Sequence, residues 1–162
     1  MIILGIDPGT ATTGCGLVRT NSKKNAKPKL ITYEKIVTDA GEEMTKRLLK
    51  LEQCLTRLIK IYKPDVMAVE KLFFNTNAKT AMSVGQARGV IMVTAARHKV
   101  PFFEYTALQS KLVVSGYGRS DKKQMRIAVR EFLSLAEEIK NDDCADALAM
   151  AICHWEKSKV TK

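Results

Sequence analysis

Apolar and polar positions along the chain follow two different periods. Short apolar runs bounded by turn residues predict strands at five places. The predicted strands cover residues 1–7, 13–20, 29–38, 66–70 and 101–105. Only turns separate the first three runs, and the polar stretch "NSKKNAKP" joins the second to the third. We therefore expect these three strands to form an antiparallel meander.

A helical period replaces the strand pattern between the later runs. Apolar residues recur at steps of three and four from Met44 to Tyr62, which predicts an amphipathic helix that stops at Pro64. Further helices are predicted over about 77–98, from Thr106, over 121–135, and from Asp142 to about Trp155. We expect a single domain over residues 1–155 and a frayed, charged tail over 156–162.

The order of these elements predicts an α/β fold. Strands separated by helices favour parallel pairing in the second half of the chain. The strands at 1–7 and 66–70 would then be central and parallel, with their carboxyl ends side by side. Ligands bind at that edge in open α/β sheets.

Both of these central strands end in a carboxylate, Asp7 and Glu70. Asp143 and Asp146 are three residues apart and share one face of the last helix. Asp142 points elsewhere and suits a first-turn or capping role. Four acids gathered in one place repel one another unless cations neutralise them, and oxygen ligands suit Mg²⁺. Two such ions about 4 Å apart can hold an attacking water and a leaving oxygen in line.

Each acid also has an ordinary structural explanation. Asp-Pro-Gly is a common turn, so Asp7 alone would be read as a turn residue. Asp143 and Asp146 alone would be acids favoured by a helix N-terminus. Glu70 is harder to explain in this way, because it closes the apolar run "VMAVE". Taken together, the four acids predict a metal site at the carboxyl edge of the sheet.

The charge balance indicates a polyanionic partner. Lysine and arginine number 27 against 17 acidic residues, which gives a formal net charge of +10 over 162 residues. A compact domain this basic suggests nucleic acid, although a basic protein can also be merely soluble.

The cysteines and histidines do not form a metal motif. Cys15, Cys54, Cys144 and Cys153 include no Cys-x-x-Cys pair, and both histidines lie far from any close cysteine pair. We expect core-filling thiols in a reducing compartment. The first apolar run is too short for a signal peptide or a membrane span, so we expect a soluble, cytoplasmic protein without a membrane role.

Five sequence blocks resemble the RuvC family of Holliday-junction resolvases. In order they are "GIDPGT…TGCG", "AVEKLFF", "GQARG", "FEY…K" and "DDCADALAMAICH". The resemblance covers residues 1 to about 155. The turn "IDPG" alone would be weak, since actin-like kinases and the YqgF family have similar turns, but five blocks in order are specific.

The resemblance implies a ribonuclease H-like fold with a five-stranded mixed sheet, three antiparallel strands followed by parallel strands. It also implies a homodimer that nicks four-way DNA junctions in recombination and repair, with Mg²⁺ as cofactor and a branch-migration motor complex as partner. Asp7, Glu70, Asp143 and Asp146 match the four metal-binding acids of the family. They would hold two ions per site, with Mn²⁺ able to replace Mg²⁺, and Asp7 would bridge the two.

Several other residues acquire expected roles from the resemblance. Phe73 matches a junction-contacting aromatic, and Phe74 matches less uniformly; either could stack on unpaired bases or pack in the core. The basic residues are expected near the scissile phosphate or on the backbone. They are Lys111, Lys122, Lys123 and Arg119, of which Arg119 is expected to contact phosphate only. Because Lys122 and Lys123 are neighbours, either one could be the lysine that matches the family position.

Two glycines lie inside the second predicted helix. Gly85 and Gly89 cost helix stability, roughly 1 kcal/mol each against alanine, but allow close helix approach. That approach is either ordinary packing within one chain or, as the resemblance suggests, pairing with a second copy across a two-fold axis.

Two rival functions remain open from the residues. A YqgF-like nuclease of RNA processing shares the fold and the first motif, and a non-catalytic DNA-binding module would share the charge. An actin-like sugar kinase is excluded, since 162 residues do not supply its second lobe.

Overall fold

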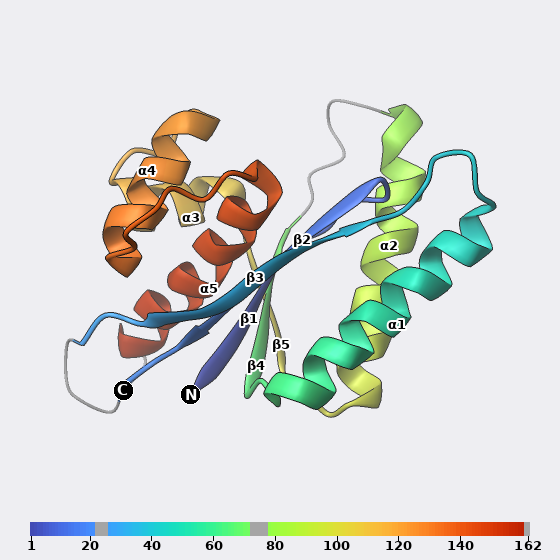
Figure 1. The fold of residues 1–162 in the computed structure, drawn as a ribbon, viewed down its shortest axis with the longest axis horizontal. Helices are drawn as coiled ribbons and strands as arrows, with labels where there is room; N and C mark the ends of the chain where they lie inside the picture. The colour runs from blue at the N-terminus through green and yellow to red at the C-terminus, as the bar shows by residue number, and fades with distance from the viewer. Residues whose placement is uncertain (22–25, 72–77, 161–162) are drawn as a thin grey trace.

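The sheet is the central layer of the molecule. The computed structural model describes residues 1–21, 26–71 and 78–160. Its five strands are ordered β3-β2-β1-β4-β5 (Figure 1). Their bounds are β1 Ile2–Asp7, β2 Thr12–Arg19, β3 Lys29–Val37, β4 Val66–Glu70 and β5 Phe102–Tyr105. The first three pair antiparallel, whereas β4 is parallel to β1 and β5 is parallel to β4, so the predicted mixed sheet is confirmed.

Helices cover both faces of the sheet. One face carries α1 and α2, and the other carries α5 with α3 and α4 beyond it (Figure 1). Their bounds are α1 Met44–Tyr62, α2 Ala78–Arg97, α3 Ala107–Ser115, α4 Lys122–Leu133 and α5 Asp142–Val160. The strands contribute to two apolar cores, one against each helical layer. No helix in the described ranges is long and apolar enough to cross a bilayer.

Helix α1 shows the amphipathic pattern in its simplest form. Leu51, Leu55, Leu58 and Ile59 are buried at helical spacing against the sheet. The helix ends at Lys63, which adopts a left-handed conformation and donates its backbone N–H to the carbonyl of Ile59.

Helix α5 packs much closer to the strands than α1 does. A Cβ added at Gly5 would overlap the carbonyl oxygen of Ala147, and one added at Gly14 would overlap that of Asp143. Strand glycines commonly mark such close backbone approach. They allow α5 to lie almost in backbone contact with β1 and β2, and this fixes the position of the helix that carries two of the predicted site acids.

The last helix is longer than the sequence predicts. The sequence predicts an end near Trp155, but α5 extends through Val160. In the added turn, Lys159 Nζ lies 3.3 Å from the centroid of the Trp155 ring and 2.8 Å from Glu156 Oε2. These local contacts stabilise a helical turn whose composition alone reads as a charged tail.

Candidate active site

The topology brings two of the predicted acids to the same edge of the sheet. Strands β1 and β4 are parallel neighbours, and their register pairs Ile6 with Val69. Asp7 and Glu70 are the next residues along each strand, so they leave the sheet side by side at its carboxyl edge. This is the juxtaposition that the order of elements predicts.

The N-terminus of α5 brings the other two acids to this edge. Asn141 caps the helix, because its Oδ1 accepts a hydrogen bond of 3.0 Å from the backbone N–H of Cys144. Gly14 pairs with Asp7 across β1 and β2, and the carbonyl of Asp143 lies directly over Gly14. The first turn of α5 is therefore seated beside Asp7, and Asp146 follows one turn later.

The electrostatics show that the four acids share one environment. Burial raises the pKa of Asp7 well above its usual range, and the charges of Glu70, Asp146 and Asp143 raise it further. Burial, and then the charge of Asp146, raises the pKa of Glu70 to about 7. Burial also raises the pKa of Asp146, although two lysines, Lys111 and Lys122, oppose the shift. Carboxyl groups in such a field are stabilised as anions by added positive charge.

The donor set fits a hard divalent cation in its chemistry. All four groups offer carboxylate oxygens, which suit Mg²⁺, Mn²⁺ or Ca²⁺ more than softer metals. Over the described residues, no three histidine, cysteine or acidic side chains come close enough together to hold one ion. The acids are thus neighbours across the junction of β1, β4 and α5 rather than a preformed ligand cage.

Two of the predicted lysines face the acids. Lys111 lies on α3, partly buried, and its charge lowers the pKa of Glu70 and Asp146. Lys122 is the first residue of α4, and its charge lowers the pKa of Asp7 and Asp146. Of the two neighbouring lysines at the start of α4, Lys122 is therefore the one whose charge acts on the acids.

The remaining predicted DNA contacts lie farther out or outside the described residues. Arg119 and Lys123 are exposed, one on the turn before α4 and one in its first helical turn. Phe73 and Phe74 lie outside the described residues, so their expected stacking stays a prediction.

The two predicted interface glycines face open space on α2. Apart from the adjacent residues and the backbone of α2 itself, no described atom lies within 4 Å of a Cβ added at Gly85 or at Gly89. Close packing against the described residues therefore does not explain these glycines. Met82, Met92 and Val93 are exposed on the same helix, and Met82 is the most exposed of the three residues at 74%.

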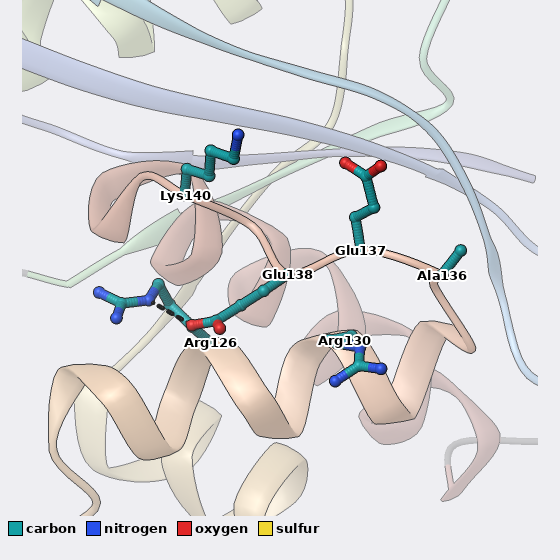
Figure 2. Close-up of a pocket in the computed structure, with 6 residues that line it drawn as sticks. All are labelled: Arg126, Arg130, Ala136, Glu137, Glu138 and Lys140. Atoms are coloured by element: carbon teal, nitrogen blue, oxygen red, sulfur yellow. Dashed lines mark hydrogen bonds and ion pairs between the residues drawn. The ribbon is translucent and has the colours of Figure 1, made fainter.

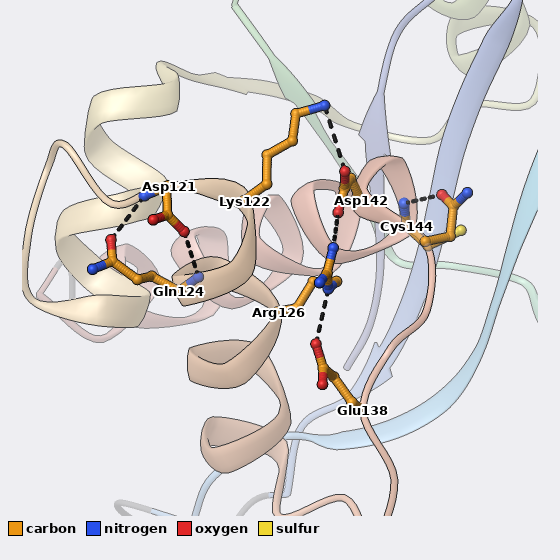
Figure 3. Close-up of polar contacts among 8 residues, drawn as sticks. Asp121, Lys122, Gln124, Arg126, Glu138, Asp142 and Cys144 are labelled. Atoms are coloured by element: carbon orange, nitrogen blue, oxygen red, sulfur yellow. Dashed lines mark hydrogen bonds and ion pairs between the residues drawn. The ribbon is translucent and has the colours of Figure 1, made fainter.

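Asp142 lies outside the group of four acids, as its helical position predicts, but its partners were not anticipated. Arg126 Nη1 donates to Asp142 Oδ1 at 2.5 Å, and Arg126 Nε donates to Glu138 Oε1 at 2.9 Å (Figure 3). Asp142 is thus an ion-pair residue in the first helical turn, while Asn141 provides the cap. The sequence does indicate the cap, because Asn141 directly precedes the two acids at the start of the helix. It does not indicate the ion pair with Arg126, which depends on how α4 packs against α5.

A hollow lies along α4, and none of the four acids lines it. It measures about 700 Å³, and residues of α4 and of the segment before α5 line it (Figure 2). Its lining mixes both charges and consists of Arg126, Arg130, Ala136, Glu137, Glu138 and Lys140. Arg126 belongs both to this hollow and to the ion pair with Asp142, which precedes Asp143 at the start of α5.

Comparison with known proteins agrees with this geometry. Residues 3–154 match the family model described as crossover junction endodeoxyribonuclease RuvC. A crossover junction endodeoxyribonuclease RuvC from Syntrophomonas wolfei is 51% identical over 161 residues, covering 99% of this chain and 92% of the relative. A second, from Desulforamulus reducens, is 51% identical over 158 residues, covering 98% of this chain and 95% of the relative.

A solved structure gives the same result for the fold. Thermus thermophilus RuvC, in complex with a Holliday junction substrate, superposes with a TM-score of 0.92 at 30% sequence identity. The superposition covers 99% of this chain and 96% of that chain. Sequence and fold agree along the whole length, and the chain belongs to the RuvC family of crossover junction endodeoxyribonucleases.

Proposed function

We propose that this chain resolves four-way DNA junctions in recombination and repair, making paired symmetric nicks with the help of divalent cations. The observation that supports the proposal is the meeting of Asp7 and Glu70, from adjacent parallel strands, with Asp143 and Asp146 from α5. A carboxylate group on the carboxyl edge of a basic protein suits phosphodiester hydrolysis.

Each acid would have a defined part in holding metal. We assign Asp7, Glu70, Asp143 and Asp146 to two Mg²⁺ ions, with Mn²⁺ as a substitute. When bound, such ions activate water and stabilise negative charge on the attacked phosphate. The acids themselves are poorly solvated, which favours their binding of cations over their remaining free anions.

The lysines would act on the DNA side of the acids. Lys111 approaches from α3 and Lys122 from α4, so the acids have positive charge on two sides. We propose that both offset the charge that develops on the phosphate during hydrolysis. Arg119 and Lys123 are exposed on the same α3–α4 region and would contact the DNA backbone, which gives affinity without sequence selection.

We further propose that the protein acts as a homodimer formed through α2. The open space at Gly85 and Gly89 and the exposed Met82, Met92 and Val93 support a helix face that a second copy covers. A two-fold enzyme suits a junction with near two-fold symmetry. A branch-migration motor partner, a cytoplasmic location, and base stacking by Phe73 and Phe74 remain predictions.

One gel tests the proposed function. A synthetic four-way junction, the matching linear duplex and a structured RNA are each incubated with the protein and Mg²⁺. We expect symmetric paired nicks in the junction, with 5′-phosphate and 3′-hydroxyl ends, and none in the duplex. Preferential cleavage of the RNA would instead support the YqgF-like alternative, and binding of the junction without cleavage would support a DNA-binding module.

Asp7→Asn is the matched control for the gel. The amide keeps the shape of the side chain but is a poor ligand for Mg²⁺, so cleavage should fall by orders of magnitude. Junction affinity without metal should hold or improve, because one charge that repels phosphate is removed. A mutant that nicks at nearly the wild-type rate would contradict the assignment of Asp7.

A further inference from the structure

Lys122 occupies an electrostatically unusual position at the start of α4. The helix begins with a capping box between Asp121 and Gln124, with hydrogen bonds of 2.8 and 2.9 Å. Lys122 is the first helical residue after this cap, where a cation is disfavoured by the helix dipole. Its side chain is 71% exposed, and its Nζ lies 3.6 Å from Asp142 Oδ2. That separation is longer than the ~2.7–2.9 Å of a strong charge-assisted hydrogen bond.

Asp142, by contrast, is held firmly by another cation. Arg126 is four residues after Lys122, so both side chains leave the same face of α4 and reach the first turn of α5 (Figure 3). Arg126 Nη1 lies 2.5 Å from Asp142 Oδ1, and the two side chains are only 26% and 30% exposed. Glu138 fixes the other edge of the guanidinium at 2.9 Å, at the border of the mixed-charge hollow (Figure 2).

Lys122 has a second set of anions within electrostatic reach. Its charge acts on Asp7 and Asp146, two of the four acids of the candidate site. An ammonium group drawn onto those acids would neutralise them and compete with a divalent cation for the same oxygens. Asp142 Oδ2 offers a competing anion just outside the group.

We propose that Arg126 and Asp142 form an ion pair, here called the bracket, that positions the Lys122 ammonium group beside the four acids and prevents it from binding to them. Arg126 fixes Asp142, and the second oxygen of Asp142 holds Lys122 loosely. Lys122 thus remains available to a DNA phosphate, and the acids remain available to metal. Arg126 and Asp142 are positioning residues, and the part of this inference that concerns phosphate rests on the proposed nuclease function.

The first test uses the protein without DNA. Mn²⁺ binding is measured by calorimetry for the wild type, Asp142→Asn, Lys122→Met and the double variant. We expect Asp142→Asn to weaken Mn²⁺ binding about tenfold, because the released lysine moves onto the acids. In the Lys122→Met background the same change should alter affinity about twofold or less. Equal weakening in both backgrounds would overturn the bracket, since Asp142 would then act through its own charge alone.

Glu138→Gln is the matched control for charge. It removes the same unit of negative charge from the same ion-pair network, but Glu138 contacts Arg126 and not Lys122. We expect its Mn²⁺ affinity to stay within about twofold of the wild type. Weakening as large as that of Asp142→Asn would overturn the proposal.

The second test measures junction cleavage at saturating Mn²⁺. Asp142→Asn should lower kcat about three- to tenfold and leave KM for the junction within about twofold, because a misplaced lysine affects the phosphate more than it affects the wider DNA surface. Unchanged kcat would overturn the positioning role. A wild type that follows the Mn²⁺ pattern but cleaves no junction would remove the proposed function and leave the bracket intact.

Arg126→Gln serves if Asp142→Asn fails to fold, as judged by its melting curve. This variant removes the ion pair between Arg126 and Asp142, so Asp142 can bind Lys122 more tightly and hold its ammonium group away from phosphate. We expect lowered kcat with unchanged Mn²⁺ affinity, and Arg126→Lys should recover part of the lost kcat. Wild-type kcat in Arg126→Gln would count against the bracket.

Discussion

Two groups of glycines in this molecule have opposite surroundings. Gly5 and Gly14, on β1 and β2, lie under α5, where an added Cβ would overlap backbone carbonyl oxygens. Gly85 and Gly89, on α2, have no described atom within 4 Å of an added Cβ apart from adjacent residues and the helix's own backbone. The strand glycines are needed for packing inside the chain, whereas packing against the described residues does not explain the helix glycines.

The two helical layers differ for the same reason. Helix α5 is seated almost on the strand backbone, and this places Asp143 and Asp146 beside Asp7. On the other face, α1 and α2 are separated from the strands by large side chains such as Leu55 and Ile91. Close backbone packing fixes the site, while side-chain packing on the opposite face leaves the outer surface of α2 open to other contacts.

Gly14→Ala should break the close-packed face most severely. The added methyl group would overlap the carbonyl of Asp143 and the N–H of Cys144, and backbone relieves such a clash poorly. We expect a loss of unfolding free energy of about 3 kcal/mol or more, together with loss of cleavage. Urea unfolding and the junction gel measure the two effects.

Gly16→Ala is the control on the same face. Its added Cβ would meet the side chain of Leu148, with Cγ at 2.5 Å, and the backbone nitrogen of Leu148 at 3.0 Å, whereas one added at Gly14 would meet backbone atoms alone. We expect a smaller loss of stability and retained cleavage. A Gly14→Ala variant with wild-type stability and full activity would show that neither stability nor cleavage requires the close packing of α5 on the strands.

A change of pH should affect the face of the sheet covered by α5 more than the face covered by α1 and α2, because the buried acids lie on the α5 side. The pKa of Glu70 is about 7 in the folded protein against an ordinary 4.5, so the folded state binds its proton more tightly than the unfolded state does. Its contribution to stability is present below pH 4.5 and is lost as pH rises through 7. For the metal-free protein we expect a loss of up to about 3 kcal/mol across this range.

Unfolding curves with a chelator at pH 4.5, 6 and 8 measure this loss, and Glu70→Gln is the comparison. His154 is present in both proteins, and burial lowers its pKa, so its effect runs the other way below about pH 6.5. The difference between wild type and variant therefore removes the effect of His154 and reports Glu70 together with its influence on the pKa of Asp7. Parallel pH profiles would contradict the raised pKa.

Tyr105→Phe should weaken the tie between α5 and the parallel strands. The Tyr105 hydroxyl is 2.8 Å from Nδ1 of the buried His154, and Tyr105 pairs with Glu70 across β4 and β5. Loss of the hydroxyl leaves a buried ring nitrogen without this partner, at a cost of about 2 kcal/mol. Thermal unfolding measures the effect. Tyr117→Phe, on an exposed tyrosine, is the control and should change stability little; equal shifts would mean that the bond to His154 contributes nothing.

Much of the fold and the position of the acids could be predicted from sequence. The strand and helix periods are clear, and the order of elements makes the strands of Asp7 and Glu70 parallel neighbours. Spacing alone puts Asp143 and Asp146 on one helical face and Asp142 off it. These features depend on local pattern and topology, which sequence carries directly.

The contacts between separate helices could not be predicted in the same way. Arg126 reaches Asp142 only because α4 packs across the start of α5, and a lone arginine in a basic chain gives no sign of this. The choice of Lys122 over Lys123 likewise depends on which face of α4 points inward. Glycines inside strands do indicate close packing by another element. They do not show that this element is α5, which only the structure identifies.

Gly89→Ala should have the smallest effect on stability and tests the open face of α2. Alanine favours a helix over glycine by up to ~1 kcal/mol, and here no described atom opposes the added methyl group. The dilute protein should therefore become slightly more stable. If a second copy covers α2, the same methyl group prevents the close approach, and self-association weakens about tenfold or more.

Sedimentation over a range of concentrations measures association, and melting at the lowest concentration measures stability. Leu49→Ala, at an exposed position of α1, should leave association unchanged. Raised stability with unaltered association would show that α2 is not the surface where two copies meet.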